Sequence, residues 1–110
     1  MARYKLVVMS KPEPGREAEY NDWYQNIHLQ QLLEIEGVRS AQRLRLKEAL
    51  SIGEVFPYLA IYEIETDDPA RLLNEIRSRA ETGKLDISDA LSADVSAALY
   101  ENFGAAVQSG

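Results

Sequence analysis

Cysteine is absent from this chain of 110 residues, and histidine occurs only once. The absence of cysteine excludes thiolate catalysis, iron–sulfur clusters, cysteine-bound zinc and any disulfide framework. One histidine is a poor set of metal ligands, and the carboxylates show no metal-binding spacing, so we expect no metal site. A chain of this length buries only about 60–68% of its unfolded surface. Because no disulfide compensates for this, we expect further burial by self-association.

Positive charge and long apolar runs are also scarce. Twelve Lys and Arg residues stand against 18 Asp and Glu residues, which gives a formal net charge of −6 at pH 7. Nucleic-acid binding requires a basic surface, so this balance argues against a nucleic-acid partner. The longest apolar run near the start, Leu6–Met9, is far too short to span a membrane, and no secretory signal is visible. We therefore expect no membrane partner and a cytoplasmic location.

Nucleotide-binding motifs are missing as well. The glycines form neither a phosphate-cradling loop nor a dinucleotide fingerprint, and no serine lies in a nucleophile elbow. Flavin, NAD and ATP are therefore not expected, and we predict a protein without a cofactor.

What is present is the composition of an ordinary globular protein, with 45% hydrophobic and 27% charged residues. The length corresponds to one domain, which we expect to span residues 1–104, followed by a C-terminal tail at 105–110. Residues 85–94 are ambiguous and compatible with one short helix. The periodicity predicts strands at residues 3–9, 38–47, 56–65 and 95–103, and helices at 16–36 and 69–82.

This β-α-β-β-α-β order predicts an α+β fold of the ferredoxin-like type, in which both helices cover one face of an antiparallel sheet. The other sheet face is still partly apolar in the sequence pattern. A second copy that meets it face to face is the economical way to cover it.

The helix expected at residues 16–36 is apolar on two sides. Leu29 and Leu33 point away from its main face, so we expect the helix to pack both on the sheet and on a second body. At about 100° per residue, the main face carries Tyr20, Trp23, Tyr24, Ile27, His28, Gln31 and Ile35.

His28 is the candidate catalytic residue. Imidazole gives or takes a proton near neutral pH, which suits the deprotonation of a phenol or an acidic carbon. Tyr24 lies one turn before His28 and Asn21 two turns before it, so that Asn21 could orient the imidazole. The alternative is a structural histidine, half-buried and bonded to a carbonyl or a tyrosine. Trp23 is rotated away from His28 in this arrangement and is expected to anchor the core or an interface.

Tyrosines and one basic strand are the other candidate binding features. Six tyrosines against two phenylalanines suit a pocket for an aromatic or quinone-like ligand, although tyrosines also fill sheet faces. The basic strand face would attract an anionic ligand, such as a carboxylate or a coenzyme A thioester. A solvated strand face that discourages aggregation is the interpretation we prefer, with Arg43 as the exception to be tested. This face carries Arg39, Arg43, Arg45 and Lys47, opposite Val38, Ser40, Gln42, Leu44 and Leu46.

Part of the chain resembles a known family. Residues 19–28 (EYNDWYQNIH), then Leu32-Leu33 and residues 36–43 (EGVRSAQR), resemble the EthD-like group of dimeric α/β-barrel proteins. In that group, a first-helix "W/F-Y…H…L" signature leads through "pGV" into a second strand that carries an arginine, near the position of Arg43 in this sequence. The order of elements and the length also match, so the resemblance covers nearly the whole chain in outline.

The resemblance implies a homodimer whose two sheets form a barrel, with a pocket between helices and sheet in each protomer. The wider superfamily includes cofactor-free monooxygenases of polyketide phenols, lactone isomerases, polyketide cyclases and haem-handling enzymes. In several members a first-helix histidine projects into the pocket, and this position is His28. We therefore expect a small hydrophobic or aromatic ligand, bound by Asn21, Tyr24, Arg43 and Tyr62.

Two functions from different classes follow. The first is a small cofactor-independent enzyme that acts on an aromatic, polyketide-like or lactone substrate by proton transfer through His28. It would be of the monooxygenase, isomerase or cyclase type. The second is a non-catalytic dimer, either a small-molecule binder or an accessory protein.

Overall fold

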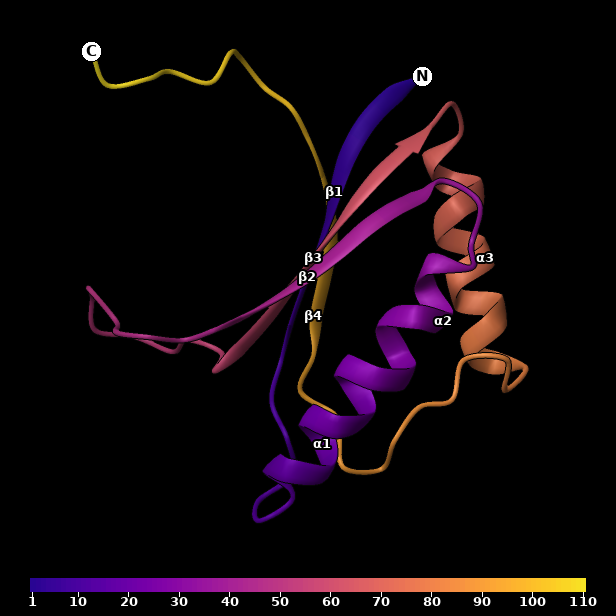
Figure 1. The fold of residues 1–110 in the computed structure, drawn as a ribbon, viewed down its shortest axis with the longest axis vertical. Helices are drawn as coiled ribbons and strands as arrows, with labels where there is room; N and C mark the ends of the chain where they lie inside the picture. Colours follow the sequence, from indigo (N-terminus) through magenta and orange to yellow (C-terminus); the bar gives the residue numbers. More distant parts are fainter.

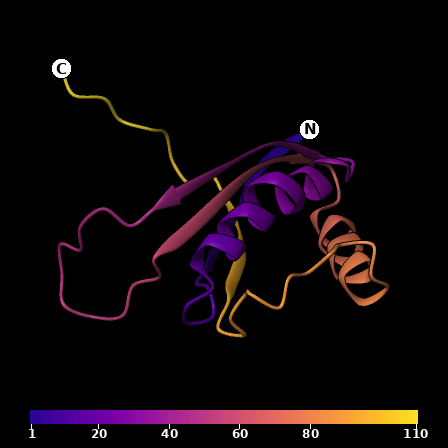
Figure 2. The ribbon, with the colours of Figure 1, turned by 60° about the horizontal axis from the view of Figure 1, so that its bottom comes forward.

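The chain forms one four-stranded antiparallel sheet with its helices on one face, as the sequence pattern predicts (Figures 1 and 2). The computed structural model describes residues 1–110, and the strand order is β2-β3-β1-β4. This is the ferredoxin-like α+β arrangement. The strands are β1 (Ala2–Ser10), β2 (Val38–Arg45), β3 (Tyr58–Thr66) and β4 (Ser96–Glu101), and the helical segments are α1 (Glu17–Trp23), η1 (Tyr24–His28), α2 (Leu29–Leu33) and α3 (Pro69–Glu81).

The strand register decides which side chains face the helices. Leu6 of β1 lies opposite Tyr62 of β3 on one side and opposite Leu99 of β4 on the other, and Tyr62 lies opposite Ala41 of β2. Opposed residues share a face of the sheet. The inner face therefore joins with the helices to form the hydrophobic core, in which Tyr20 and Tyr62 are completely buried.

The first helix is continuous but contains a π-helical turn, which the periodicity did not predict. The backbone N–H of Leu29 donates to the carbonyl of Tyr24, five residues earlier, instead of four. Such a turn holds one extra residue, so the face that packs on the sheet shifts along the sequence. The prediction that Ile27 belongs to the buried face is wrong, because Ile27 is 38% exposed, while Leu29 and Leu32 are buried.

A bulge in β2 changes the predicted faces of this strand. The register shifts between Val38 and Ser40, so Val38 is buried and the faces are exchanged beyond it. Arg43 then lies opposite Ala60 on the inner face, whereas Leu44 is 42% exposed on the outer face. The predicted alternation, which placed Val38 and Arg43 on opposite faces of this strand, is therefore wrong.

The second predicted helix forms where the sequence places it, but the segment after it is not helical. α3 begins as predicted, with Pro69 in its first turn and the Asp68 carboxylate accepting a hydrogen bond from the backbone N–H of Arg71 at 3.1 Å. The ambiguous residues 85–94 form no helix. They form an irregular connection that is tied to the loop after β1 by two backbone hydrogen bonds, Glu13 to Ala90 and Ser92 to Lys11.

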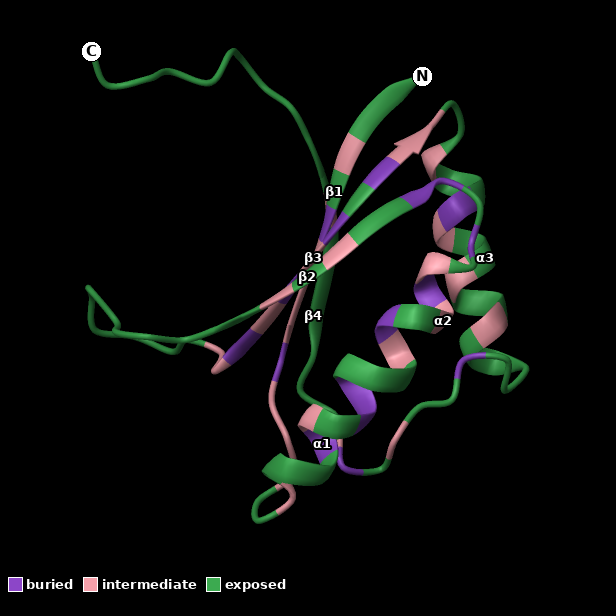
Figure 3. Cartoon of the chain, in the orientation of Figure 1, coloured by how far each residue is buried: buried purple, intermediate pink, exposed green.

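Two segments extend away from the body, namely the β2–β3 connection at residues 46–57 and the end of the chain at 102–110 (Figures 1 and 3). Both expose large apolar side chains completely, Leu50 and Ile52 in the first and Phe103 in the second. The radius of gyration is 15.0 Å, against about 13 Å for a compact domain of this size. None of the helices combines the length and the apolar character that crossing a membrane requires.

Candidate functional site

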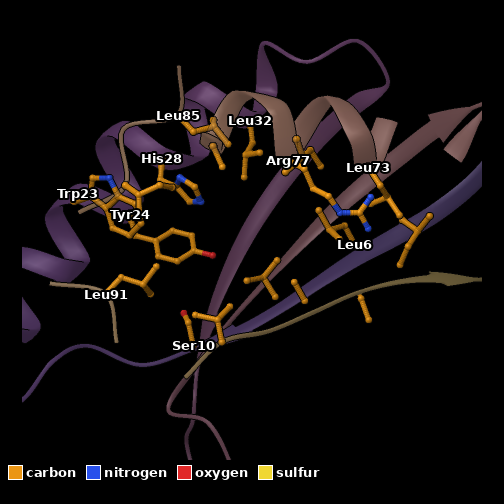
Figure 4. Close-up of a pocket in the computed structure, with 18 residues that line it drawn as sticks. Leu6, Ser10, Trp23, Tyr24, His28, Leu32, Leu73, Arg77, Leu85 and Leu91 are labelled. Carbon is orange, nitrogen blue, oxygen red and sulfur yellow. The ribbon is translucent and has the colours of Figure 1, made fainter. Parts of the chain in front are cut away.

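A cavity of about 340 Å³ lies between the first helix, α3 and the β1–β4 side of the sheet (Figure 4). The connection after α3 completes its wall through Leu85, Ile87 and Leu91, so the segment whose structure the sequence leaves ambiguous encloses the site. Fifteen of its 18 lining residues are hydrophobic. The other three are Ser10, His28 and Arg77.

His28 lines this cavity from the π-helical turn. Its imidazole stacks on the indole of Trp23, with ring centroids 4.6 Å apart, and meets the edge of Tyr24 at 5.0 Å. The Nδ1 atom is buried and has no hydrogen-bond partner. Burial lowers the pKa of His28 from 6.5 to about 4. The imidazole is therefore uncharged at neutral pH and can accept a proton.

The π-helical turn explains why Trp23 and His28 meet. In a regular α-helix, residues five apart are rotated by about 140° and do not face each other. The wider turn at Tyr24–His28 brings each residue close to the one five positions earlier, so His28 lies almost above Trp23. The prediction that Trp23 is rotated away from His28 is therefore wrong, because the indole stacks on the imidazole ring. The indole N–H also donates to the carbonyl of Asp86 at 2.5 Å, which ties the helix to the connection after α3.

Hydroxyl groups gather on the sheet side of the cavity. Tyr24 directs its hydroxyl towards the sheet, on the side of Ser10 (Figure 4), where the oxygen itself is buried. Burial raises the pKa of Tyr24 to about 12 and raises the pKa of Tyr62 further, so both phenols stay protonated. Neither hydroxyl has a hydrogen-bond partner. The Ser10 and Tyr20 hydroxyls, by contrast, bond to each other at 2.5 Å.

Ser10 is a site residue that sequence reasoning missed. It is only 1% exposed and ends the inner face of β1, where Leu6 and Val8 precede it at the strand period of two. A serine followed shortly by Pro12 is typical of the beginning of a loop, which concealed this role. Its place in an apolar face is the signal that could have identified it.

Arg43 and Asn21 lie together behind Tyr24 and do not line the cavity. The guanidinium of Arg43 lies 4.7 Å from the ring centroid of Tyr24 and 5.3 Å from that of Tyr58. It donates to the side-chain oxygen of Asn21 at 2.6 Å, and the Asn21 amide donates to the Tyr58 hydroxyl at 3.1 Å. Asn21 thus positions Arg43 and not His28. Tyr62 is also absent from the cavity wall, because it is completely buried beneath the first helix.

The five predicted site residues therefore form two layers. Tyr24 and His28 line the cavity, and Asn21, Arg43 and Tyr62 lie outside its wall. No three His, Asp or Glu side chains are grouped so as to hold a metal ion. The arrangement offers a proton acceptor, a phenolic hydrogen-bond donor and an apolar space for a ligand.

Comparison with known proteins finds solved structures of similar fold at low sequence identity. No protein-family model matches the chain, and no curated protein matches it. An ethyl tert-butyl ether D (EthD) family protein from Bacillus halodurans C-125 has a similar structure, with a TM-score of 0.62 and 13% identity over 92% of this chain and 99% of the other. The chain has an EthD-like fold.

A second solved structure shares this EthD-like fold. It is a protein from Shewanella loihica PV-4 described as a "putative monooxygenase", with a TM-score of 0.62 and 14% identity over 94% of this chain and 97% of the other. At such identities the likeness shows the architecture alone, so the chemistry must be argued from the site itself.

The partly buried His28 predicts a pH-dependent stability. The imidazole has a pKa near 6.5 in the unfolded chain and about 4 in the fold. The stability that the uncharged imidazole contributes to the fold is therefore complete above pH 6.5 and is lost as the pH falls towards 4. Between pH 7.5 and pH 5, the free energy of unfolding should fall by about 2 kcal/mol because of this group.

Urea unfolding at the two pH values measures this loss. A His28→Gln variant contains the same carboxylates but lacks the imidazole, so its free energy of unfolding should fall by about 2 kcal/mol less between the two pH values. An equal loss in both proteins would show that the imidazole is solvated in the native state.

Proposed function

We propose that the protein is a small cofactor-independent enzyme that removes a proton from an aromatic or related substrate in this cavity, with His28 as the base. The observation that carries the proposal is the placement of His28. It is a neutral imidazole with an unpartnered Nδ1, held against two aromatic rings in the wall of an apolar cavity. In a histidine with a structural role, the ring nitrogens normally form hydrogen bonds within the protein.

The protonation state favours a base over an acid. With a pKa of about 4, only about one molecule in a thousand carries a protonated His28 at pH 7. When a phenolate or enolate forms beside it, the new negative charge raises the pKa of the imidazole, and the low polarity of the cavity strengthens this attraction. The proton is thereby retained on His28 as an ion pair with the substrate anion.

Tyr24 supplies the second part of the chemistry. Its hydroxyl is buried on the sheet side of the cavity, towards Ser10 (Figure 4), has no hydrogen-bond partner in the protein and remains protonated because its pKa is about 12. It can therefore donate a hydrogen bond to the oxygen on which negative charge develops. Trp23 and Arg43 hold the two rings from behind, the first by stacking on His28 and the second by lying over Tyr24.

The cavity sets the size of the substrate. Its volume of about 340 Å³ is roughly twice the ~150 Å³ of an apolar cavity that binds benzene. Two fused rings are therefore a suitable size. In the oxygenase form of the reaction, a bound naphthol anion would react with dioxygen; one oxygen atom would enter the ring to give a quinone, and the other would leave as water.

Two bicyclic compounds test this proposal. In D₂O, wild-type protein should accelerate deuterium exchange at the acidic carbons of 2-tetralone, measured by NMR. With 1-naphthol, oxygen uptake and quinone absorbance detect the oxygenase form. Binding of both compounds without exchange or oxidation would contradict the enzyme and favour a non-catalytic binder.

We further propose that the protein is a homodimer formed through the outer face of the sheet. This face carries apolar side chains from all four strands, and the exposed segments at 46–57 and 102–110 extend beyond it. Native mass spectrometry should give an ion near twice the chain mass of 12.4 kDa. A monomer at all micromolar concentrations would contradict this. The residues of this face are Val7, Met9, Leu44, Leu59, Ile61, Ala98 and Tyr100.

A further inference from the structure

Arg77 is the only charged side chain that lines the cavity. Leu73, Ile76 and Ala80 of the same helix α3 also line it, so Arg77 lies on the helix face that turns towards the site. Its guanidinium lies in the space near Leu6 and Leu73, across the cavity from His28 (Figure 4).

This guanidinium has no acidic partner within the protein. Its one hydrogen bond runs from Nη1 to the Asn74 side-chain oxygen at 2.9 Å, and no carboxylate lies within 4.0 Å of it. Arg79, two residues further along α3, is by contrast paired with Glu75 at 2.7 Å. Arg77 is an exposed residue, so most of its five N–H donors are open to water or to another group.

The surroundings define which group this would be. A guanidinium presents paired donors that match the two oxygens of a carboxylate. The protein as a whole carries a formal charge of −6, which repels anions in general. An anion in this apolar cavity therefore depends on the one cation that lines it.

From these observations we propose that the ligand of the cavity is an amphipathic acid, and that Arg77 binds its carboxylate while the apolar body reaches towards His28 and Tyr24. The inference rests on the proposed use of the cavity as the substrate site. It adds the charge of the substrate and the residue that selects for it. It places the anion contact on α3, and not on the basic strand at 38–47 that the sequence offered as an alternative.

A structural role for Arg77 leads to a different expectation. Long basic side chains often lay their methylene stems on apolar surface and keep the charged head in water. In that case the charge of the ligand is irrelevant, and neutral and anionic ligands of equal shape bind equally.

A matched pair of probes separates the two roles. We would measure the dissociation constants of 6-hydroxy-2-naphthoate and 6-hydroxy-2-naphthamide by calorimetry; they share the bicyclic body and differ in charge. Wild-type protein should prefer the naphthoate by about tenfold. Arg77→Gln should abolish this preference and leave the affinity for the amide within about twofold. Arg77→Lys should retain part of it. Arg71→Gln, an equal change of charge on α3 outside the cavity, should retain all of it.

Equal affinities for the two probes in wild-type protein, or an unchanged preference in Arg77→Gln, would overturn the proposal. Failure of both probes to bind at millimolar concentration would overturn it together with the proposed substrate site. A charge preference that depends on Arg77, in a protein that catalyses no proton exchange, would support the anion site and remove the enzymatic function. The two proposals can therefore fail separately.

Discussion

Replacing His28 with glutamine is expected to slow the deuterium exchange of 2-tetralone by about 10²- to 10⁴-fold, while the affinity for the ligand changes by no more than a few-fold. Glutamine retains polarity and much of the volume but cannot hold the proton. The wild-type rate should be nearly constant from pH 6 to pH 8, because His28 is already deprotonated above its pKa of about 4. NMR exchange rates at several pH values measure both effects.

Gln25→Ala provides a matched control for this change. Gln25 lies in the same π-helical turn but is exposed to solvent, so its removal should leave the exchange rate unchanged. The thermal midpoints of both variants show whether the fold is intact. An exchange rate in His28→Gln within threefold of wild type would place the base elsewhere in the cavity and return His28 to a structural role.

The sequence was sufficient for the architecture because each element carries a strong local signal. The Asp68-Pro69 start of α3, the glycines that follow the helices and the apolar alternation of β3 all agree with the same fold. The ends of the strands were less accurate. β3 begins at Tyr58 and not at 56, because Pro57 has no N–H to contribute to the ladder.

The site was predicted less completely, and the π-helical turn is the main reason. One extra residue in that turn rotates all later side chains relative to the earlier ones. A fixed period of 3.6 residues therefore placed Ile27 inside and separated Trp23 from His28. The stacking of these two rings, which covers part of the proposed base, depends on a backbone irregularity that hydrophobic periodicity does not reveal.

The bulge in β2 had the same effect on Arg43. Its shift in register turns Arg43 under the first helix, where Asn21 accepts its hydrogen bond.

Arg77 was missed for a different reason. It is one of several arginines on an amphipathic helix, and only the tertiary arrangement shows that it lines a cavity and lacks the acidic partner that Arg79 has.

Substituting Gly37 with alanine should produce the largest loss of stability, about 3 kcal/mol, with a fall in thermal midpoint on the order of 15 °C. Gly37 follows the first helix with a φ of +102°, a conformation that costs an L-residue about 1–2 kcal/mol. A Cβ atom there would also lie 2.8 Å from Leu72 Cδ1 and 3.3 Å from the carbonyl oxygen of Glu65. Relieving these contacts requires Leu72, which is buried, to move. Urea unfolding measures the loss.

Gly83→Ala separates strain from crowding. Gly83 follows α3 with a φ of +79°, and a Cβ atom added to it would meet no other atom within 4 Å, so only the strain applies and the loss should be about 1 kcal/mol. Leu72 belongs to α3, which also carries Leu73, Ile76 and Arg77 on the cavity wall. Displacing it should therefore weaken the binding of 6-hydroxy-2-naphthoate in Gly37→Ala but not in Gly83→Ala. Equal losses of stability in both variants would mean that the Leu72 side chain moves aside at little cost. The position of α3, and of the cavity wall that it forms, would then not depend on the close packing at Gly37.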